Sequence, residues 1–352
     1  MPGAAAVSFA DVPTETASIG AFIDALPKVE LHVHLVGSAS VPTVLELARR
    51  HPDGRVPVDE RELRAFYGFR DFPHFAEVYE SVSSLVRTPE DVGTLVFGVA
   101  RDLAAQNVRY VELTVTPYTH QRAGMPMPAV TEALDHAVRE ARDRLGVRVA
   151  YIFDIPGEFG ADGARGTLEH ALRHPPEALV GFGIGGIEQM RPPHRDAFRD
   201  AFAAARAAGL RSLPHAGEMT GPETIWEAID GLGAERIGHG TSCLDDPRLV
   251  ARLRETQLPL EVCPTSNVCT GQVPDLASHP LPRMLEAGLF VTLNSDDPPM
   301  FDTTLTGEYR VAAEVFGLGR EDLAALARNA VTASSLDEPG RKAIIADIDA
   351  LL

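Results

Sequence analysis

The segment Val29-Glu30-Leu31-His32-Val33-His34 sets the pattern from which the fold can be predicted. It is a short run rich in apolar residues, as expected for a buried strand, and it ends in two histidines. Seven further runs of this kind follow, separated by segments with apolar residues at helical spacing. The eight expected strands are Val29–His34, Val108–Val115, Val147–Asp154, Ala178–Ile184, Leu210–His215, Glu235–His239, Leu258–Cys263 and Leu289–Ser295. Alternating strands and helices in one chain of 352 residues predict an α/β fold, the (β/α)8 or TIM barrel.

Chemically reactive side chains stand at the carboxyl ends of four of these expected strands. They are His32 with His34, His215, His239, and Asp296 with Asp297. Active sites of such barrels lie at the carboxyl ends of the strands, so residues far apart in the sequence are expected to meet on one rim. Because His32 and His34 are two residues apart on a strand, both side chains should point into the barrel.

Three imidazoles and one carboxylate can fill the coordination sphere of a metal ion, and a further histidine and Glu218 then remain for proton transfer. Neutral imidazole and carboxylate oxygen suit Zn²⁺ best, although Fe²⁺, Mn²⁺ or Co²⁺ fit the same sphere. A His-x-His pair alone is weak evidence, because paired histidines are often polar loop residues. A third histidine and an aspartate at other strand ends strengthen the metal interpretation.

The other candidate residues each have a plainer alternative. Glu218 follows His215 by three residues, and Gly217 between them allows a tight turn toward the metal, but most glutamates in loops are simply solvated. His239, between two glycines, is either a core histidine or a residue that orients the attacking water. Asp297 is either a helix cap or a second carboxylate in the site, and both aspartates reach the site only if the strand turns there.

A long segment separates the first two expected strands, from about residue 36 to 106. It contains helical patterns and the aromatic cluster Phe66-Tyr67-Gly68-Phe69-Arg70-Asp71-Phe72. An insertion of this length over the catalytic rim is typical of a lid. We therefore expect a frayed leader over residues 1–20 and a single barrel domain over 21–352 that carries this helical lid.

The composition restricts the partners and the compartment. The formal net charge is −18 and the isoelectric point is about 5.1, which argues against a nucleic-acid surface and against binding to an anionic membrane. No apolar run is long enough to span a bilayer. Three cysteines do not form a disulfide framework, so a reducing, cytoplasmic location is expected. The sequence leaves the oligomeric state open.

Five segments together resemble the adenosine deaminase family. They are Pro27–Leu35, Ser212–Glu218, Arg236–Thr241, Leu260–Asn267 and Val291–Pro298, within a resemblance that runs from about Leu26 to Ser335. The resemblance implies one Zn²⁺ per chain, held by His32, His34, His215 and Asp296. It implies that Glu218 protonates ring N1, that His239 positions the attacking hydroxide, that Asp297 contacts N7 and that the backbone N–H of Gly186 contacts N3. The implied reaction is hydrolytic deamination of a small molecule, a 6-aminopurine nucleoside.

The chain departs from the family pattern at Val36, where the family usually has an acid that binds the ribose 5′-hydroxyl. A hydroxyl left unpaired against an apolar side chain costs about 1–3 kcal/mol, so Val36 favours a substrate without that group. Among family substrates, aminodeoxyfutalosine fits, because this intermediate of menaquinone biosynthesis carries a ketone-linked benzoate instead. Val36 would then pack on carbon, and Phe69 and Phe72 of the lid would stack on the benzoate. Adenosine, converted to inosine, and adenine are the alternative substrates.

The same residues argue against three other functions. Many binuclear metallohydrolases need a carboxylated lysine in mid-barrel, but the only lysines are Lys28 and Lys342. A non-catalytic zinc-binding barrel would have lost Glu218 or a zinc ligand, and neither is lost. A cytidine-deaminase site needs His-x-Glu with Pro-Cys-x-x-Cys, and this sequence has no such pair.

Overall fold

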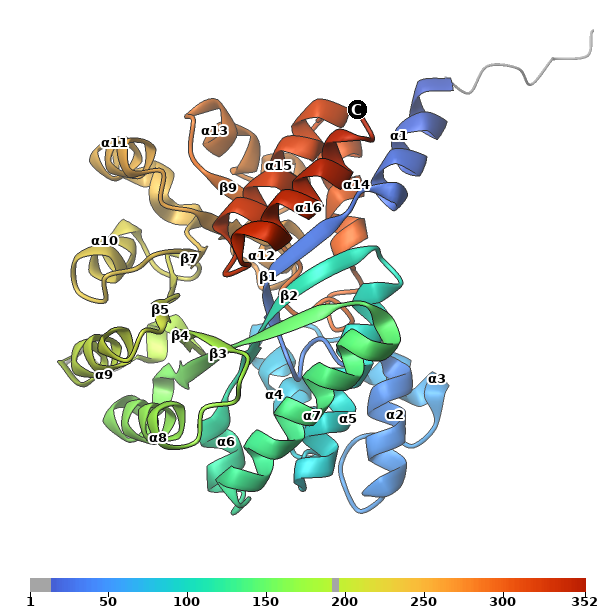
Figure 1. Ribbon diagram of the computed structural model, residues 1–352, viewed down its shortest axis with the longest axis vertical. Helices are drawn as coiled ribbons and strands as arrows, with labels where there is room; N and C mark the ends of the chain where they lie inside the picture. Colours follow the sequence, from blue (N-terminus) through green and yellow to red (C-terminus); the bar gives the residue numbers. More distant parts are fainter. Residues whose placement is uncertain (1–13, 192–195) are drawn as a thin grey trace, which may run out of the picture.

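The computed structural model describes residues 14–191 and 196–352, which form a parallel barrel surrounded by helices (Figure 1). The strands are β1 (Lys28–His34), β2 (Val108–Val115), β3 (Arg148–Pro156), β4 (Leu179–Gly185), β5 (Arg211–Ser212), β6 (His215–Ala216), β7 (Ile237–His239), β8 (Leu260–Val262) and β9 (Val291–Leu293). Strands β1 to β5 pair in chain order in one parallel sheet, and β6 to β9 pair in chain order in a second. The predicted barrel is confirmed, with shorter strands than expected in its second half.

The fifth expected strand is divided into β5 and β6 by Pro214. Proline has no N–H group to donate, so the regular ladder stops there. The backbone nevertheless continues the barrel wall, because the N–H of Leu213 donates to the carbonyl oxygen of Phe182 (2.9 Å) and the N–H of Gly238 donates to that of Pro214 (3.0 Å). The two short strands therefore occupy a single position in the barrel.

The barrel closes where the segment after β9 meets β1. The N–H of Asp296 donates to the carbonyl oxygen of His32 (2.9 Å), and the N–H of His34 donates to the carbonyl oxygen of Asp296 (3.1 Å). Val33 and Asp296 form the corresponding parallel bridge. This closure brings the two ends of the metal-ligand pattern, which lie more than 250 residues apart in the sequence, onto adjacent strands.

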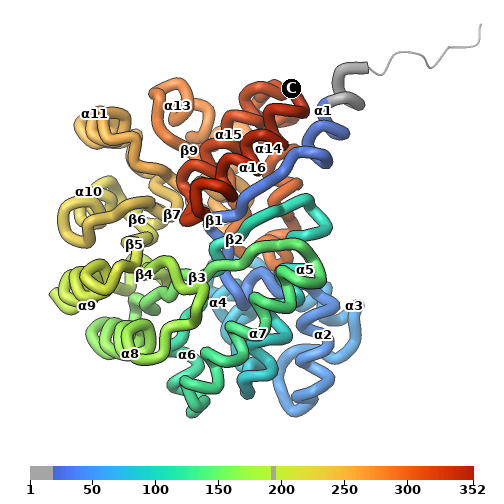
Figure 2. The backbone as a smooth tube through the Cα atoms, viewed as in Figure 1, coloured from blue at the N-terminus to red at the C-terminus, as the bar shows by residue number. Residues whose placement is uncertain are grey.

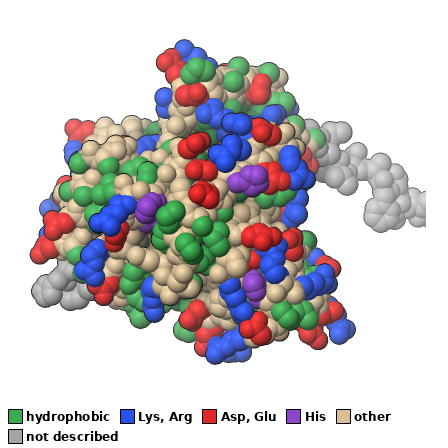
Figure 3. All heavy atoms as spheres, turned by 60° about the horizontal axis from the view of Figure 1, so that its bottom comes forward, with side chains coloured by type: hydrophobic (Ala, Val, Ile, Leu, Met, Phe, Trp, Pro, Cys, Tyr) green, Lys and Arg blue, Asp and Glu red, His purple; other side chains and the backbone are tan. Residues whose placement is uncertain are grey.

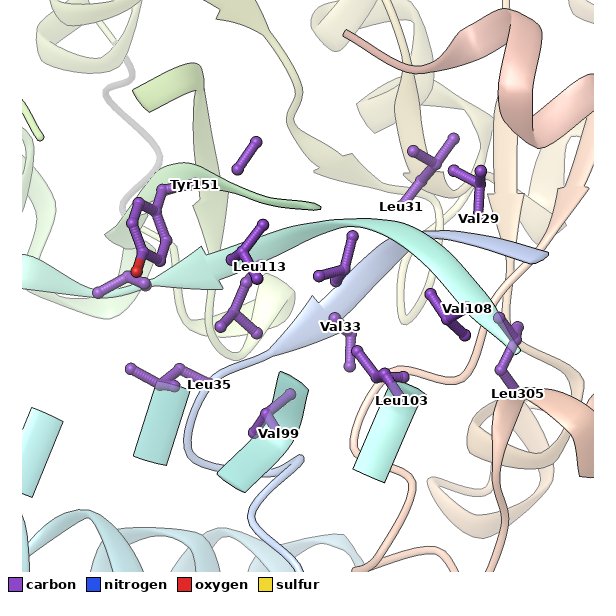
Figure 4. Close-up of a cluster of buried hydrophobic side chains, with 14 of the residues drawn as sticks. Val29, Leu31, Val33, Leu35, Val99, Leu103, Val108, Leu113, Tyr151 and Leu305 are labelled. Carbon is purple, nitrogen blue, oxygen red and sulfur yellow. The ribbon is translucent and has the colours of Figure 1, made fainter. Parts of the chain in front are cut away.

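One face of strand β1 packs against the outer helices, and the other faces the barrel interior. Figure 4 shows Val33 on the side of β1 that faces Val99 and Leu103 of α5 (Pro89–Ala104), and all three side chains are buried. Successive strand residues alternate between faces, so His32 and His34 point the opposite way, into the barrel. Packing of the apolar face against helices thus holds both histidines toward the interior.

The outer helices follow the strands in chain order, and Figure 2 shows α8 to α11 arranged one after another around the barrel. These helices are α6 (Pro117–Arg122), α7 (Met127–Leu145), α8 (Gly160–Arg173), α9 (Asp196–Ala207), α10 (Pro222–Asp230), α11 (Pro247–Thr256), α12 (Pro264–Cys269) and α13 (Leu281–Glu286). The C-terminal helices are α14 (Leu305–Glu314), α15 (Arg320–Ala333) and α16 (Glu338–Asp349), and α14 and α15 contact α1 (Thr14–Ala25). Helix α1 begins inside the expected leader, of which residues 1–13 lie outside the described part of the chain.

The expected insertion between β1 and β2 is helical. It consists of α2 (Val41–Arg50), α3 (Glu60–Phe66), α4 (Phe72–Ser83) and α5. Helix α5 packs against α7 and so belongs to the outer ring, which leaves α2 to α4 as the added part. Whether these helices move as a lid stays a prediction.

On the molecular face in Figure 3, acidic and basic side chains are interspersed. Within the described residues, no helix combines the length and the apolar character that crossing a membrane requires.

Candidate active site

Four histidines and Asp296 converge at the carboxyl ends of β1, β6, β7 and β9. The Nε2 atom of His34 lies 3.2 Å from Nε2 of His215 and 3.3 Å from Oδ1 of Asp296. The Nε2 atom of His32 lies 3.6 Å from the same carboxylate oxygen. His239 is on the other side of this carboxylate, with Nε2 3.9 Å from Oδ2. The structure thus brings together all four residues that we predicted as metal ligands.

Two of the site residues have left-handed backbone conformations, which are uncommon for residues other than glycine. The φ angle is +66° at Asp296 and +62° at His239. The turn at Asp296 allows both Asp296 and Asp297 to face the cavity, which an extended strand would prevent. Gly37 makes room for the second carboxylate, since a Cβ atom there would lie 1.6 Å from Oδ1 of Asp297.

The nitrogen atoms of the cluster fit a divalent metal ion. Ligand atoms of His32, His34 and His215 lie within 4.8 Å of one another. Within the described chain, the buried Nε2 of His32 has no hydrogen-bond partner. An unpaired buried polar atom is costly, and a cation between facing imidazoles would remove that cost. Three imidazole nitrogens and one carboxylate oxygen form a donor set typical of mononuclear zinc sites.

A second group of possible ligands shares His32 and Asp296 and adds His239 and Cys263. The Sγ atom of Cys263, however, lies 3.6 Å from the carbonyl oxygen of Glu261, as a thiol donor would. The first group therefore fits a metal better.

A buried row of charged residues holds the ring of His32. Oε2 of Glu261 lies 2.9 Å from Nδ1 of His32, and Oε1 accepts a hydrogen bond from Arg236. Arg236 also donates to Oε2 of Glu112 (2.6 Å). Burial opposes the ionisation of Glu261, but Arg236 and His32 outweigh it and lower its pKa to about 2. The ionised Glu261 accepts a hydrogen bond from Nδ1–H of His32 and leaves Nε2 free to bind a metal.

Glu218 lies beside the cluster, with Oε2 3.6 Å from Nε2 of His239. Burial, and then the negative charge of Asp296, raise the pKa of Glu218 above its ordinary value. Gly217 adopts a φ of +66°, and a Cβ atom there would lie 2.5 Å from Ile225. The tight turn expected before Glu218 therefore requires glycine.

Sequence reasoning missed Glu188, which anchors the loop that carries Glu218. Its buried carboxylate accepts hydrogen bonds from the backbone N–H groups of Gly217 (2.9 Å), Glu218 (3.2 Å) and Met219 (2.9 Å). No spacing signal connects Glu188 to this loop, because the contact spans about thirty residues. Glu261 was missed too, although it lies inside the segment Leu260–Asn267 that the sequence singled out.

A cavity of about 960 Å³ opens over the cluster. Its lining includes the proposed chemical groups His34, His215, Glu218, His239, Asp296 and Asp297, together with Gly186. Helix α4 contributes Phe72, Phe75 and Tyr79. Burial, and then Asp296, raise the pKa of Asp297 above its ordinary value. The volume is near the upper end of typical small-molecule sites, so the cavity has room for more than a purine base.

Two residues that we expected at the substrate lie elsewhere. Val36 is 8% exposed, belongs to the hydrophobic core and is absent from the cavity lining. Phe69 is also absent from it and packs behind Phe75 and Phe301, with ring centroids 5.2 Å and 5.9 Å away. Their distance from the cavity follows from the fold of the insertion, in which α4 rather than the segment before it forms the wall.

Two arginines also line the cavity, Arg87 after α4 and Arg122 at the end of α6. Arg87 is engaged, because it donates to both carboxylate oxygens of Asp53 at 2.8 Å and 2.9 Å. Arg122 lies over the ring of Phe159, 4.4 Å from its centroid, and has no ion pair within the described residues. Arg122 is therefore the cation available to an anionic ligand.

Comparison with known proteins shows which family has this fold and these motifs. A family model described as adenosine deaminase matches residues 27–351. The chain is 52% identical over 330 residues to an aminodeoxyfutalosine deaminase of Streptomyces avermitilis, covering 93% of this chain and 92% of the relative. A crystal structure of an adenine deaminase from Arthrobacter aurescens superposes with a TM-score of 0.87 at 30% identity, over 92% of this chain and 98% of that one. An amidohydrolase from Burkholderia ambifaria with bound Zn has a TM-score of 0.87 at 29% identity, over 99% and 96% of the two chains.

The family match extends over nearly the whole barrel and includes every strand end that contributes to the site. Hydrolytic cleavage of a C–N bond is the chemistry of this family. The chain belongs to the adenosine deaminase family.

Proposed function

We propose that the protein is a zinc-dependent hydrolytic deaminase of aminodeoxyfutalosine, acting in menaquinone biosynthesis. Water replaces the amino group at C6 of the purine, and ammonia leaves. The observation that carries the proposal is one cavity that opens over the cluster of three histidines and an aspartate and is lined by two buried carboxyl groups and by an arginine without a carboxylate partner in the described structure. The relative from Streptomyces avermitilis supports the same substrate.

His32, His34, His215 and Asp296 would hold one zinc ion per chain. When bound, zinc would act as a Lewis acid and activate the water that replaces the amino group. The hydrogen bond from Ser266 to Oδ2 of Asp296 (2.5 Å) and that between His32 and Glu261 orient two of these ligands.

The two buried carboxyl groups act on the purine ring. Because its pKa is raised, Glu218 is available in the protonated form and donates its proton to N1, which makes C6 more electrophilic. Asp297, whose pKa is also raised, donates to N7 in the same protonated form. The backbone N–H of Gly186 donates to N3. A side chain at Gly186 would meet Oε2 of Glu158 at 2.1 Å, so glycine is needed for this approach.

The remaining cavity receives the group attached to the 5′ carbon. Phe72 and Tyr79 of α4 supply aromatic surface for a benzoate ring, and the guanidinium of Arg122 pairs with its carboxylate. Adenine alone would leave this part of the cavity empty, and adenosine would offer no anion to Arg122. The alternative adenine deaminase function, suggested by the Arthrobacter aurescens structure, is therefore disfavoured.

The cellular setting follows from the same features. The three cysteines are free, which suits a reducing compartment, and we propose a cytoplasmic location. The function uses no nucleic acid or membrane.

We also propose that α2 to α4 act as a lid on a single domain.

Ammonia release from aminodeoxyfutalosine tests the proposal. The metal-free protein, prepared with a chelator, should be inactive, and one equivalent of Zn²⁺ per chain should restore turnover. In water enriched in ¹⁸O, the product should gain one labelled oxygen. A protein that is active without metal, or that needs two equivalents, would contradict the proposed site.

A further inference from the structure

A buried chain of hydrogen bonds connects the backbone of α13 to His239. The N–H of Leu281 donates to Nδ1 of His279 (3.0 Å). Nε2 of His279 lies 3.2 Å from Oδ1 of Asn267, and Nδ2 of Asn267 lies 3.3 Å from Nδ1 of His239. Asn267 is fully buried, and His279 and His239 are 3% and 1% exposed, so water does not compete for these bonds.

The direction of every bond in this chain follows from its first member. A backbone N–H can only donate, so Nδ1 of His279 must be the acceptor and the ring carries its proton on Nε2. That Nε2–H then requires an oxygen from Asn267, which places the amide nitrogen toward His239. The assignment of the Asn267 oxygen and nitrogen therefore rests on an unambiguous donor rather than on choice.

The last member of the chain is the site residue. Nδ1 of His239 faces the N–H of Asn267 and must accept, so a neutral His239 carries its proton on Nε2. This Nε2 points into the site, 3.6 Å from Oε2 of Glu218 and 3.9 Å from Oδ2 of Asp296. His239 thus presents a hydrogen-bond donor to the cavity and has no free nitrogen with which to accept a proton.

We infer that Asn267 and His279 are positioning residues that hold His239 with Nδ1 as an acceptor and its Nε2–H directed into the site. This inference rests on the proposed deaminase function and adds two residues that act through His239. In this orientation His239 donates a hydrogen bond to the attacking oxygen. Loss of one such preorganised donor lowers kcat by roughly 10²–10³-fold.

Three substitutions separate hydrogen-bond direction from packing. In Asn267→Asp, the carboxylate accepts from both rings, so His239 must carry its proton on Nδ1 and turns a lone pair toward the cavity. In His279→Gln, an amide can still accept from Leu281 and donate to Asn267, so the direction is kept. In His279→Leu, the chain is cut while a similar apolar volume remains.

Two measurements on the zinc-loaded proteins decide the inference. The first is the tautomer of His239 by ¹⁵N NMR with labelled histidine, with its signals assigned from His239→Gln. Wild type and His279→Gln should show the Nε2–H form, and Asn267→Asp the Nδ1–H form. The second is steady-state kinetics, in which Asn267→Asp and His279→Leu should lose kcat with KM and zinc content unchanged, while His279→Gln stays near wild type.

An Nδ1–H tautomer in wild-type protein would overturn the inference, and so would full kcat in Asn267→Asp. Because the wild-type spectrum is decisive by itself, the inference stays testable even if Asn267→Asp does not fold. Failure of the proposed function is distinguishable, since it would appear as no ammonia release by zinc-loaded wild type from any 6-aminopurine, whatever the tautomer.

Discussion

Oε2 of Glu261 lies 2.9 Å from Nδ1 of His32, and Arg236 binds the other oxygen of the same carboxylate. Glu261 therefore fixes which nitrogen of His32 carries the proton and directs Nε2 toward the metal cluster. The ion pair with Arg236 keeps the carboxylate charged although it is buried. A metal ligand on β1 is thus oriented by a residue on β8, a strand separated from β1 by β9.

Glu261→Gln should weaken zinc binding by roughly 10–100-fold, because a neutral amide is a poorer acceptor for the imidazole N–H and removes one of the two carboxylate partners of Arg236. Competition with a chromogenic chelator measures the zinc dissociation constant. Glu255→Gln, an exposed position on α11, is the matched control. Equal zinc affinity in Glu261→Gln and wild type would refute the orienting role.

Glu218→Gln should retain one zinc ion and lose roughly 10²–10⁴-fold in kcat, since an amide cannot deliver a proton to N1. Metal analysis and steady-state deamination of the zinc-loaded variant check both parts. Glu223→Gln changes an exposed glutamate at the start of α10 and should leave kcat unaltered. Near-normal turnover in Glu218→Gln would remove this residue from the mechanism.

Arg122→Gln should raise KM for aminodeoxyfutalosine about tenfold, the lower end for a charged hydrogen bond, because Arg122 is exposed to solvent. Adenosine, which has no carboxylate, should be deaminated as before. Arg252→Gln removes an exposed arginine of α11 outside the cavity lining and serves as the control. An equal loss on both substrates would show that Arg122 supports the fold rather than the benzoate.

Acid should destabilise the protein partly through His120, which is buried and whose pKa burial lowers to about 4. The unfolded chain binds this proton with a pKa of 6.5, so unfolding takes up a proton between pH 6.5 and 4 and stability falls as the pH falls through that window. The expected loss at pH 5 is about 2 kcal/mol. Urea unfolding of wild type and His120→Gln at pH 7 and pH 5 measures the contribution of His120 to this loss of stability. Equal pH dependence of the two proteins would contradict the prediction.

The metal cluster was predictable because its residues stand at strand ends, and a parallel barrel brings all strand ends to one rim. The shared direction of the two histidines of β1 followed from the two-residue period of a strand alone. A turn at Asp296 was expected only if both aspartates were to reach the site. Apart from the prolines that follow, nothing in the local sequence requires a left-handed backbone there. The break at Pro214 was overlooked, although the missing N–H of proline could have indicated it.

Residues that act through other residues were not predictable. Glu188, Asn267 and His279 lie outside the expected strand ends, and their roles depend on how loops fold over the rim. The residues that line the substrate cavity were predicted only in part, for the same reason. Phe72 was expected there and lines the cavity, whereas Phe69, three residues earlier, packs behind Phe75 and Phe301. Arg122 comes from a helix that carried no sequence signal.

The most direct test of the central claim is a comparison of kcat/KM for aminodeoxyfutalosine, adenosine, methylthioadenosine and adenine with one zinc-loaded preparation. We predict the highest kcat/KM for aminodeoxyfutalosine, because only this substrate places a carboxylate within the cavity that contains Arg122. A higher kcat/KM for adenosine or adenine would contradict the substrate assignment, and no release of ammonia from any of the four would contradict the deaminase function itself.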